Sequence, residues 1–531
     1  MVMRLGLVIS TVACSAASAQ PVGSLAAWTS MGGDPSRMSA RTIEPGNLAS
    51  VRWVRGQTDA GLPIQYLGHA GLVATTLPFP RVFTAGVVDG VTFALAINAE
   101  GGQIVWATPI PPMVFDSWAS PAIDPRGGVV VYAAGSSVVA LRMLDGVEQW
   151  RTDLAGPPVN VSPVITPDLG LANRLFVTDY GGFGGESFLS CINVSPRHAT
   201  LNPFDPGEIV WSVPIGSSNG ASPAYHEGVV YVCSSGLDGD GRGEIRAFDA
   251  RATIAPAPLW TFVNPIPEGF FGGIALREGS GGPFVYAATY AFTGSFSSAN
   301  MVKVRARSGE LVWSVPSNRT SSVPVVLADG RIALSTGLLG FGSVPMVQMF
   351  RDHGTWAEPL WNTAQGTWQD ANLNGRLDAG EYLAVGGWTT QPLLARGRST
   401  GASDRLIVGA IPAGSSVSTA YTTLYALDLS KMPGQPGFIA GQTAQAGSTA
   451  AMLGAGVYSV GVNGLAALGT PPPRFDVNSD GVIDIEDLHA WEQGQGQRDV
   501  DRSGAADDAD REMLVFELRR NEARELGEGG R

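Results

Sequence analysis

The chain is poor in charged residues and almost lacks lysine. Charged residues make up 15% of its 531 residues, and lysine occurs only at Lys303 and Lys431. The net charge is −13, whereas nucleic acids and anionic membranes bind basic patches. Beyond the N-terminus, no run of about eighteen uninterrupted apolar residues is present, as a transmembrane helix would need. We therefore expect neither a nucleic-acid partner nor a transmembrane segment.

Cysteine is also scarce. The three cysteines are Cys14, Cys191 and Cys233. None is adjacent to another, and no Cys-x-x-Cys-His haem motif occurs. Cys191 and Cys233 lie in apolar, strand-like runs, where small buried thiols are expected. If the protein is exported, a disulfide between them is the alternative.

Glycine and proline, by contrast, are abundant. The sequence contains 69 Gly and 36 Pro, and 44% of its residues are apolar. This composition suits many short strands joined by tight turns and is unlike that of a helical or a disordered chain. The length exceeds what one ordinary core supports, so we expect several domains or a repeat architecture.

The N-terminus has the pattern of a secretory signal. Arg4 is followed by an apolar stretch from Leu5 to Ala13, and Ala17-Ser18-Ala19 is a small-x-small cleavage site. We expect residues 1–19 to be removed before Gln20. The mature protein would then be extracellular, on the cell surface or periplasmic. A lipoprotein signal at Cys14 is the alternative, although Thr11 stands where an aliphatic residue is usual.

Internal repetition is the strongest pattern in the chain. Each copy is a short apolar strand, a turn with glycine and a strand that closes on tryptophan, as in 96–106, 140–150 and 304–313. The tryptophans recur every 44 to 61 residues, which is typical of one four-stranded propeller blade per repeat. The tryptophans of this series are Trp53, Trp106, Trp150, Trp211, Trp260, Trp313 and Trp361, and a copy without one runs from Leu424 through Ile439.

The two ends of the repeat region complement each other. Residues 457–460 and 464–468 supply two strands of a last blade without a closing Trp strand, whereas 51–53 supply such a strand with nothing before it. Joining them would close a ring and leave no exposed edge. We predict an all-β, eight-bladed β-propeller over residues 20–469. Seven blades would result if 383–440 were irregular.

A second marker, proline at the start of an inner strand, precedes most repeats, because proline loses no ladder hydrogen bond there. It occurs at Ser120-Pro121-Ala122, Ser162-Pro163-Val164, Ser222-Pro223-Ala224, Val323-Pro324-Val325 and Gln391-Pro392-Leu393.

These repeats, with Trp28 and the opening run Gly32-Gly33-Asp34-Pro35-Ser36-Arg37, resemble pyrroloquinoline-quinone-like propeller repeats. Quinoprotein alcohol dehydrogenases and outer-membrane-assembly lipoproteins share such repeats. The dehydrogenases hold their quinone between a tryptophan and a pair of adjacent cysteines, which this chain lacks. The resemblance therefore implies the fold and leaves the function open.

One loop inside the predicted ring, 370–381, has the full EF-hand pattern. Calcium takes six to eight oxygen ligands, which this loop type offers at positions 1, 3, 5, 7, 9 and 12, with glycine at position 6. We expect the loop to bind calcium and to stiffen the connection between two blades. The predicted ligands are Asp370, Asn372, Asn374, the carbonyl of Arg376, Asp378 and Glu381.

Two further loops of this type follow the repeats. Residues 470–474 are proline-rich and predict a stiff, extended linker. The loops 476–487 and 499–510 carry Asp at position 12, and each is followed by a helix-like run. The predicted ligands are Asp476, Asn478, Asp480, the carbonyl of Val482, Asp484 and Asp487, and then Asp499, Asp501, Ser503, the carbonyl of Ala505, Asp507 and Asp510.

Residues 475–518 resemble type I dockerins in their tandem loops, their position-12 Asp and the helix after each loop. The resemblance implies a cohesin-like partner. However, the inter-loop segment is short, and Gln493-Gly-Gln-Gly-Gln497 would end the first helix early. A small calcium-stapled module that caps the chain is the alternative. Residues 519–531 form a charged tail.

The favoured function from sequence is a secreted or cell-surface, calcium-binding propeller that acts as a non-enzymatic scaffold. It would bind a protein or glycan on a propeller face and be tethered through 475–518. The alternative is a propeller enzyme, quinone-dependent or acting on polysaccharides, within a dockerin-organised assembly. No catalytic or quinone-binding residue could be assigned from the sequence.

Overall fold

The computed structural model describes residues 24–529 except 68–70, 78, 115–118, 126, 183, 218–219, 237–240, 292–298, 338–342, 398–402, 411–421 and 481. The predicted signal peptide and its cleavage site lie outside these residues. From residue 523 onward only the backbone of the last helix is described.

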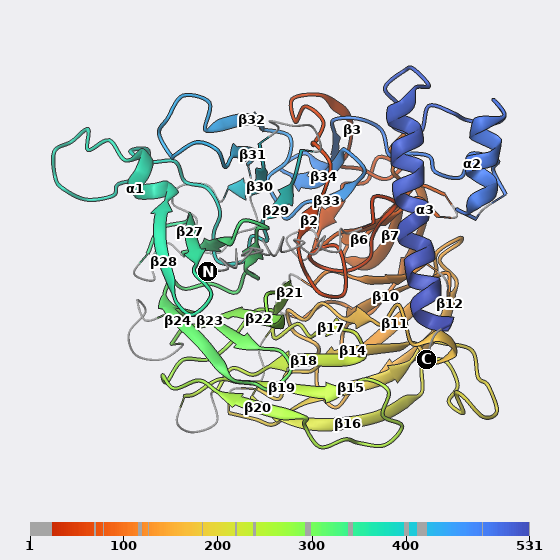
Figure 1. Ribbon diagram of the computed structural model, residues 1–531, viewed down its shortest axis with the longest axis horizontal. Coiled ribbons are helices and arrows are strands. Elements are labelled where there is room, and N and C mark those ends of the chain that lie inside the picture. The colour runs from red at the N-terminus through yellow and green to blue at the C-terminus, as the bar shows by residue number, and fades with distance from the viewer. Residues whose placement is uncertain are drawn as a thin grey trace, which may run out of the picture.

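Eight antiparallel sheets surround one axis (Figure 1). The first blade consists of β5 (Val73–Thr75), β6 (Arg81–Val88), β7 (Val91–Asn98) and β8 (Ile104–Pro109), and the second of β9 (Ala122–Asp124), β10 (Val129–Ala134), β11 (Ser137–Arg142) and β12 (Glu148–Asp153). The third consists of β13 (Val164–Ile165), β14 (Arg174–Thr178), β15 (Ser187–Asn193) and β16 (Ile209–Gly216), and the fourth of β17 (Ala224–His226), β18 (Val229–Cys233), β19 (Glu244–Asp249) and β20 (Trp260–Val263). A short strand, β4 (Gln65–Tyr66), also pairs with β6.

The last four blades follow the same plan from the axis outward. They are β21 (Ala275–Gly279), β22 (Gly282–Ala288), β23 (Asn300–Arg305), β24 (Leu311–Pro316); β25 (Val325–Val326), β26 (Arg331–Thr336), β27 (Met346–Asp352), β28 (Ala357–Asn362); β29 (Leu393–Ala395), β30 (Arg405–Ala410), β31 (Thr423–Asp428), β32 (Ile439–Thr443); and β33 (Ala451–Leu453), β34 (Gly456–Gly461), β35 (Gly464–Leu468), β3 (Val51–Arg55).

The two ends of the repeat region close the ring, as the sequence predicts. β3 is the outer strand of the eighth blade and pairs antiparallel with β35. The 383–440 region contributes a regular seventh blade, so the eight-bladed prediction is confirmed. The inner strand of the last blade, β33, has no proline marker and was not predicted.

The repeated tryptophan and glycine join neighbouring blades. Trp53 of the eighth blade packs on Gly102 of the first, and its indole N–H donates to the Ala99 carbonyl at 3.3 Å. Trp106 packs on Gly146 of the next blade in the same way. These glycines have positive φ and no room for a Cβ, since one on Gly102 would lie 2.7 Å from the Trp53 ring. The repeated Trp and Gly in the sequence therefore correspond to packing contacts between neighbouring blades.

Helices are few in the described chain. Besides a 3-10 turn at Gly170–Ala172, they are α1 (Thr363–Thr367), α2 (Ile485–Glu492) and α3 (Asp508–Gly529). α2 ends where the Gln-Gly run begins, as predicted. None of these described helices combines the length and the apolar character that crossing a bilayer requires.

The C-terminal residues pack on the propeller. Pro472 and Pro473 of the proline-rich segment, expected to be an extended linker, are buried, and Pro473 lies against Gly454 in the β33–β34 turn. Phe475 and Leu514 belong to the same apolar core as β33 to β35. Burial of these apolar side chains favours the docked arrangement over an extended one.

The tryptophan–glycine contact can be tested with a matched pair of substitutions. Gly90 (φ +77°) and Gly102 (φ +75°) both adopt the left-handed conformation, but nothing lies within 4 Å of a Cβ on Gly90. We expect Gly90→Ala to lower the free energy of unfolding by about 1–2 kcal/mol through backbone strain alone. Gly102→Ala should cost roughly 1–3 kcal/mol more, because it also displaces Trp53. Equal effects in urea denaturation would contradict the packing role.

Candidate metal loops and the filled channel

The N-terminal segment occupies the channel on the propeller axis. Residues 24–41, called here the axial hairpin, pair through β1 (Ala27–Trp28) with β5 and through β2 (Ala40–Arg41) with β29. Inner-strand amides of further blades also donate to it. Leu276 N–H donates to the Ser36 carbonyl at 2.9 Å, and Tyr225 N–H to the Pro35 carbonyl at 2.8 Å. The hairpin thus supplies partners that the inner edges would otherwise lack.

Arg37 anchors the hairpin near the axis. Its guanidinium is fully buried and donates to the carbonyls of Met31, Ser162 and Pro223 at 2.7 to 3.0 Å. Burial lowers the pKa of Arg37, and the charge of Asp34 opposes that shift. Three carbonyl partners from the hairpin and two different blades fix the position of this segment.

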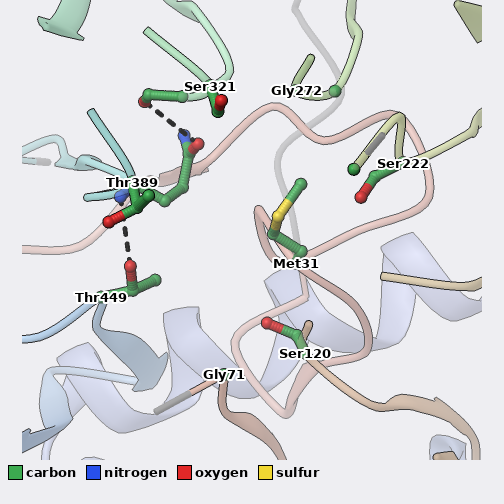
Figure 2. Close-up of a pocket in the computed structure, with 12 residues that line it drawn as sticks. Met31, Gly71, Ser120, Ser222, Gly272, Ser321, Thr389 and Thr449 are labelled. Carbon is green, nitrogen blue, oxygen red and sulfur yellow. Dashed lines mark hydrogen bonds between the residues drawn. The ribbon is translucent and has the colours of Figure 1, made fainter. Parts of the chain in front are cut away.

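The tip of the hairpin lies in a ring of small polar residues contributed by successive blades. Met31 is at the centre, with Ser120, Ser222, Thr389 and Thr449 among the residues around it (Figure 2). The cavity left beside Met31 measures about 20 Å³. Since one water needs roughly 10–15 Å³ by this measure, the cavity holds about one water.

Hydrogen bonds link this ring from blade to blade. The Ser162 hydroxyl accepts the Ser120 N–H at 2.8 Å, and the Ser222 hydroxyl accepts the Ser162 N–H at 2.9 Å. Gln391 N–H donates to the Thr449 hydroxyl at 3.1 Å in the same way. The residue before the proline marker therefore has a structural role that the sequence analysis missed. The repeated Ser-Pro dipeptide in the sequence could have indicated this role.

The two described cysteines are free thiols. Cys191 lies in β15 and Cys233 in β18, both fully buried in separate apolar clusters. Burial raises the pKa of the Cys233 thiol to about 12, which suppresses the reactive thiolate. The small-buried-thiol interpretation is thus the one observed.

The three predicted calcium loops share one backbone shape. Position 4 has positive φ in each, at Leu373 (58°), Ser479 (63°) and Arg502 (61°). Position 6 is also left-handed at Gly375 and Gly504, while Gly481 lies outside the described residues. A non-glycine residue with positive φ is uncommon, so its recurrence at one position indicates a common loop fold.

The loops also share their internal hydrogen bonds. The position-1 carboxylate accepts backbone N–H groups across the loop, as Asp370 does from Asn374 at 3.0 Å and from Gly375 at 2.9 Å. The position-12 carboxylate accepts them from the loop start, as Asp487 does from Val477 at 2.6 Å. These bonds hold the carboxylates on the inside of the turn, where a cation would need them.

The position-9 and position-12 residues join the last two loops to their helices. Asp484 caps α2, where its carboxylate accepts the Glu486 N–H at 2.8 Å. Asp507 accepts the Ala509 N–H at 2.9 Å at the start of α3. Burial raises the pKa of Asp487 and of Asp510, and backbone N–H groups oppose the shift.

The third loop gathers the most compact acidic group. Carboxylate oxygens of Asp499, Asp501 and Asp510 lie within 4.8 Å of one another. One oxygen of Asp499, Oδ1, is buried and has no hydrogen-bond partner among the described residues. An unpartnered buried carboxylate oxygen between two other carboxylates suits a divalent cation with oxygen ligands. These residues fit calcium.

The first loop lies apart from the other two, on the exposed insertion between α1 and β29. Glu381 connects its ends, since its carboxylate accepts the Trp368 indole N–H at 3.4 Å and the Ala371 N–H at 3.1 Å. Asp378 accepts both the Asn372 and Asn374 side-chain amides, and these bonds lower its pKa. Among the described residues, three carboxylates of a predicted ligand set lie within 4.8 Å of one another only in the third loop.

The comparisons with known proteins agree with this fold. A model of the family described as outer membrane protein assembly factor BamB matches residues 68–185. No curated protein shows a significant match to the chain.

Solved structures that are similar to this one cover most of the chain at low identity. A europium-containing methanol dehydrogenase is 9% identical, with a TM-score of 0.51, and covers 93% of this chain and 95% of its own. BamB from Moraxella catarrhalis is 17% identical, with a TM-score of 0.46, covering 80% and 96%. A quinohemoprotein alcohol dehydrogenase from Pseudomonas putida HK5 is 10% identical, with a TM-score of 0.48, covering 82% and 75%. Of these three, the methanol dehydrogenase is the one with a TM-score above 0.5, and its similarity supports the fold and no particular chemistry.

The third loop offers a matched test of calcium binding. Asp508 and Asp510 both lie in the first turn of α3, but only Asp510 faces the cluster. We expect Asp510→Asn to weaken calcium binding at this loop at least ~10-fold, because a charged ligand is lost. Asp508→Asn should leave binding unchanged. Isothermal titration calorimetry of the full chain checks both, and equal affinities would contradict the assignment.

Proposed function

We propose that this chain is an exported, calcium-binding β-propeller that acts as a non-enzymatic scaffold for a protein or glycan partner. Calcium binding in the loops 370–381, 476–487 and 499–510 stabilises its inter-blade insertion and its C-terminal module. Export rests on the signal-like sequence of residues 1–19.

The filled channel is the observation that carries this proposal. Propellers commonly bind small molecules near the axis, where loops from all blades converge. Here the axial hairpin occupies that position, and a water-sized cavity of about 20 Å³ remains beside Met31. A tricyclic quinone and its alcohol substrate require a pocket of several hundred Å³. The hairpin residues that fill the space, such as Trp28 and Arg37, are themselves buried.

The C-terminal module has an outer face that supports partner binding. Ile485 at the start of α2 is 48% exposed and Val482 in the preceding loop is 53% exposed, although both are apolar. Exposed apolar side chains beside a calcium loop are consistent with a cohesin-like partner on α2. The apolar face of α3 is used within the chain, so such a partner would contact α2 and the loops.

The quinone alternative gives a direct test. The full chain, loaded with calcium, is dialysed against pyrroloquinoline quinone and then assayed for dye reduction with primary alcohols. We expect no retained quinone and no alcohol-dependent dye reduction, because the hairpin fills the channel. Stoichiometric quinone uptake with alcohol-dependent turnover would contradict the scaffold proposal.

A further inference from the structure

The C-terminal module lies at the seam where β3, from the start of the chain, pairs with the last blade. Figure 1 shows α3 and α2 together at the rim of the ring. Buried residues of the module share a core with the last blade and with Leu25 at the start of the axial hairpin. Phe475, Trp491, Val500 and Leu514 are among the module residues in this core.

A buried carboxylate of α3 holds the base of the hairpin. Glu517 is 1% exposed, and its two oxygens accept the Ser24 hydroxyl at 2.5 Å and the Leu25 N–H at 3.2 Å. The Leu25 carbonyl in turn accepts the Gly454 N–H of the β33–β34 turn at 2.9 Å. Arg520 pairs with Glu517 at 3.3 Å and balances its charge. Charge-assisted bonds of this kind are stronger than neutral ones.

A second contact holds the seam between the eighth and first blades. Glu100 of the first blade pairs with Arg502 at 2.6 Å and with Arg474 at 3.1 Å. The neighbouring Ala99 carbonyl accepts the indole N–H of Trp53 at 3.3 Å and the hydroxyl of Tyr458 at 3.0 Å, both from the closing blade. The C-terminal residues thus bind the turn around Ala99 and Glu100, to which the blade containing β3 is also bonded.

The third calcium loop connects these two contacts. Arg502 is its position 4, held at positive φ, and Asp510, its position 12, belongs to the first turn of α3. Glu517 follows Asp510 by two helical turns, and both are buried on the same side as Leu514. Without a cation, the carboxylates of Asp499, Asp501 and Asp510 repel one another at close range. The loop conformation that positions Arg502 and α3 therefore depends on neutralisation of the negative charge of these three carboxylates.

We propose that calcium in the loop 499–510 makes the C-terminal module a strap, which locks the axial hairpin in the channel and fastens the seam between the eighth and first blades. This inference rests on the calcium binding proposed above. The strap gives the module a role within the chain that is additional to any partner on α2. Removal of calcium would free both the hairpin and β3 while the middle blades stay folded.

Hydrogen exchange of the full chain, measured by mass spectrometry with calcium and with chelator, tests the strap. We expect chelation to raise exchange at least ~10-fold in peptides covering 24–41 and 51–55, because local opening becomes easier there. Exchange in β18 and β22 should change little, which serves as the internal control. In the presence of calcium, Asp510→Asn should reproduce the chelator effect and Asp508→Asn should not.

A second pair of variants separates the strap from calcium binding itself. Glu517→Gln should raise exchange in 24–41 while calcium stoichiometry stays the same, and Glu512→Gln, exposed on the same helix, should have no effect. Should Glu517→Gln fail to fold, Arg502→Gln gives the same test through 51–55.

The outcomes distinguish the two proposals. If calorimetry finds calcium at 499–510 but exchange in 24–41 is equal with and without chelator, the strap is wrong and the proposed calcium binding stands. If calorimetry finds no calcium at this loop, both are overturned there.

Discussion

The antiparallel pairing of β3 with β35 is the contact on which the ring depends. It joins residues more than four hundred positions apart, so its formation carries a large cost in chain entropy that local contacts do not repay. Several contacts around the pair offset this cost. Trp53 packs on Gly102, Tyr458 bonds to the Ala99 carbonyl, and Arg474 and Arg502 pair with Glu100. Residues from both ends of the chain thereby meet at the seam between the eighth and first blades.

The second constraint on the fold is that the axial hairpin must fit inside the channel. A propeller leaves the inner edge of each blade unpaired along the channel. In this chain several of those edges bond to backbone of the axial hairpin, and Arg37 donates to carbonyls of two blades. The filled channel is compatible with a binding or scaffolding role.

The sequence predicted the parts of the fold that repeat and missed the parts that do not. Tryptophan, glycine and proline markers recur once per blade because each blade meets the same neighbour, and the unpaired strand at Val51–Trp53 revealed the closure. The axial hairpin has no periodicity, since Arg37 acts through carbonyls 125 and 186 residues away. The docking of α3 likewise depends on Glu517 and Ser24, 493 residues apart. The three calcium loops could be predicted because all predicted ligands of each loop lie within twelve consecutive residues.

The most direct measurement is a crystal structure of the calcium-loaded full chain with anomalous diffraction data that locate calcium. The hairpin and strap predict continuous density for residues 24–41 in the channel, with Met31 inside the ring, Glu517 bonded to Ser24 and an anomalous peak between Asp499, Asp501 and Asp510. An open channel with the N-terminal segment outside it, or a module detached from the seam while calcium is bound, would contradict them.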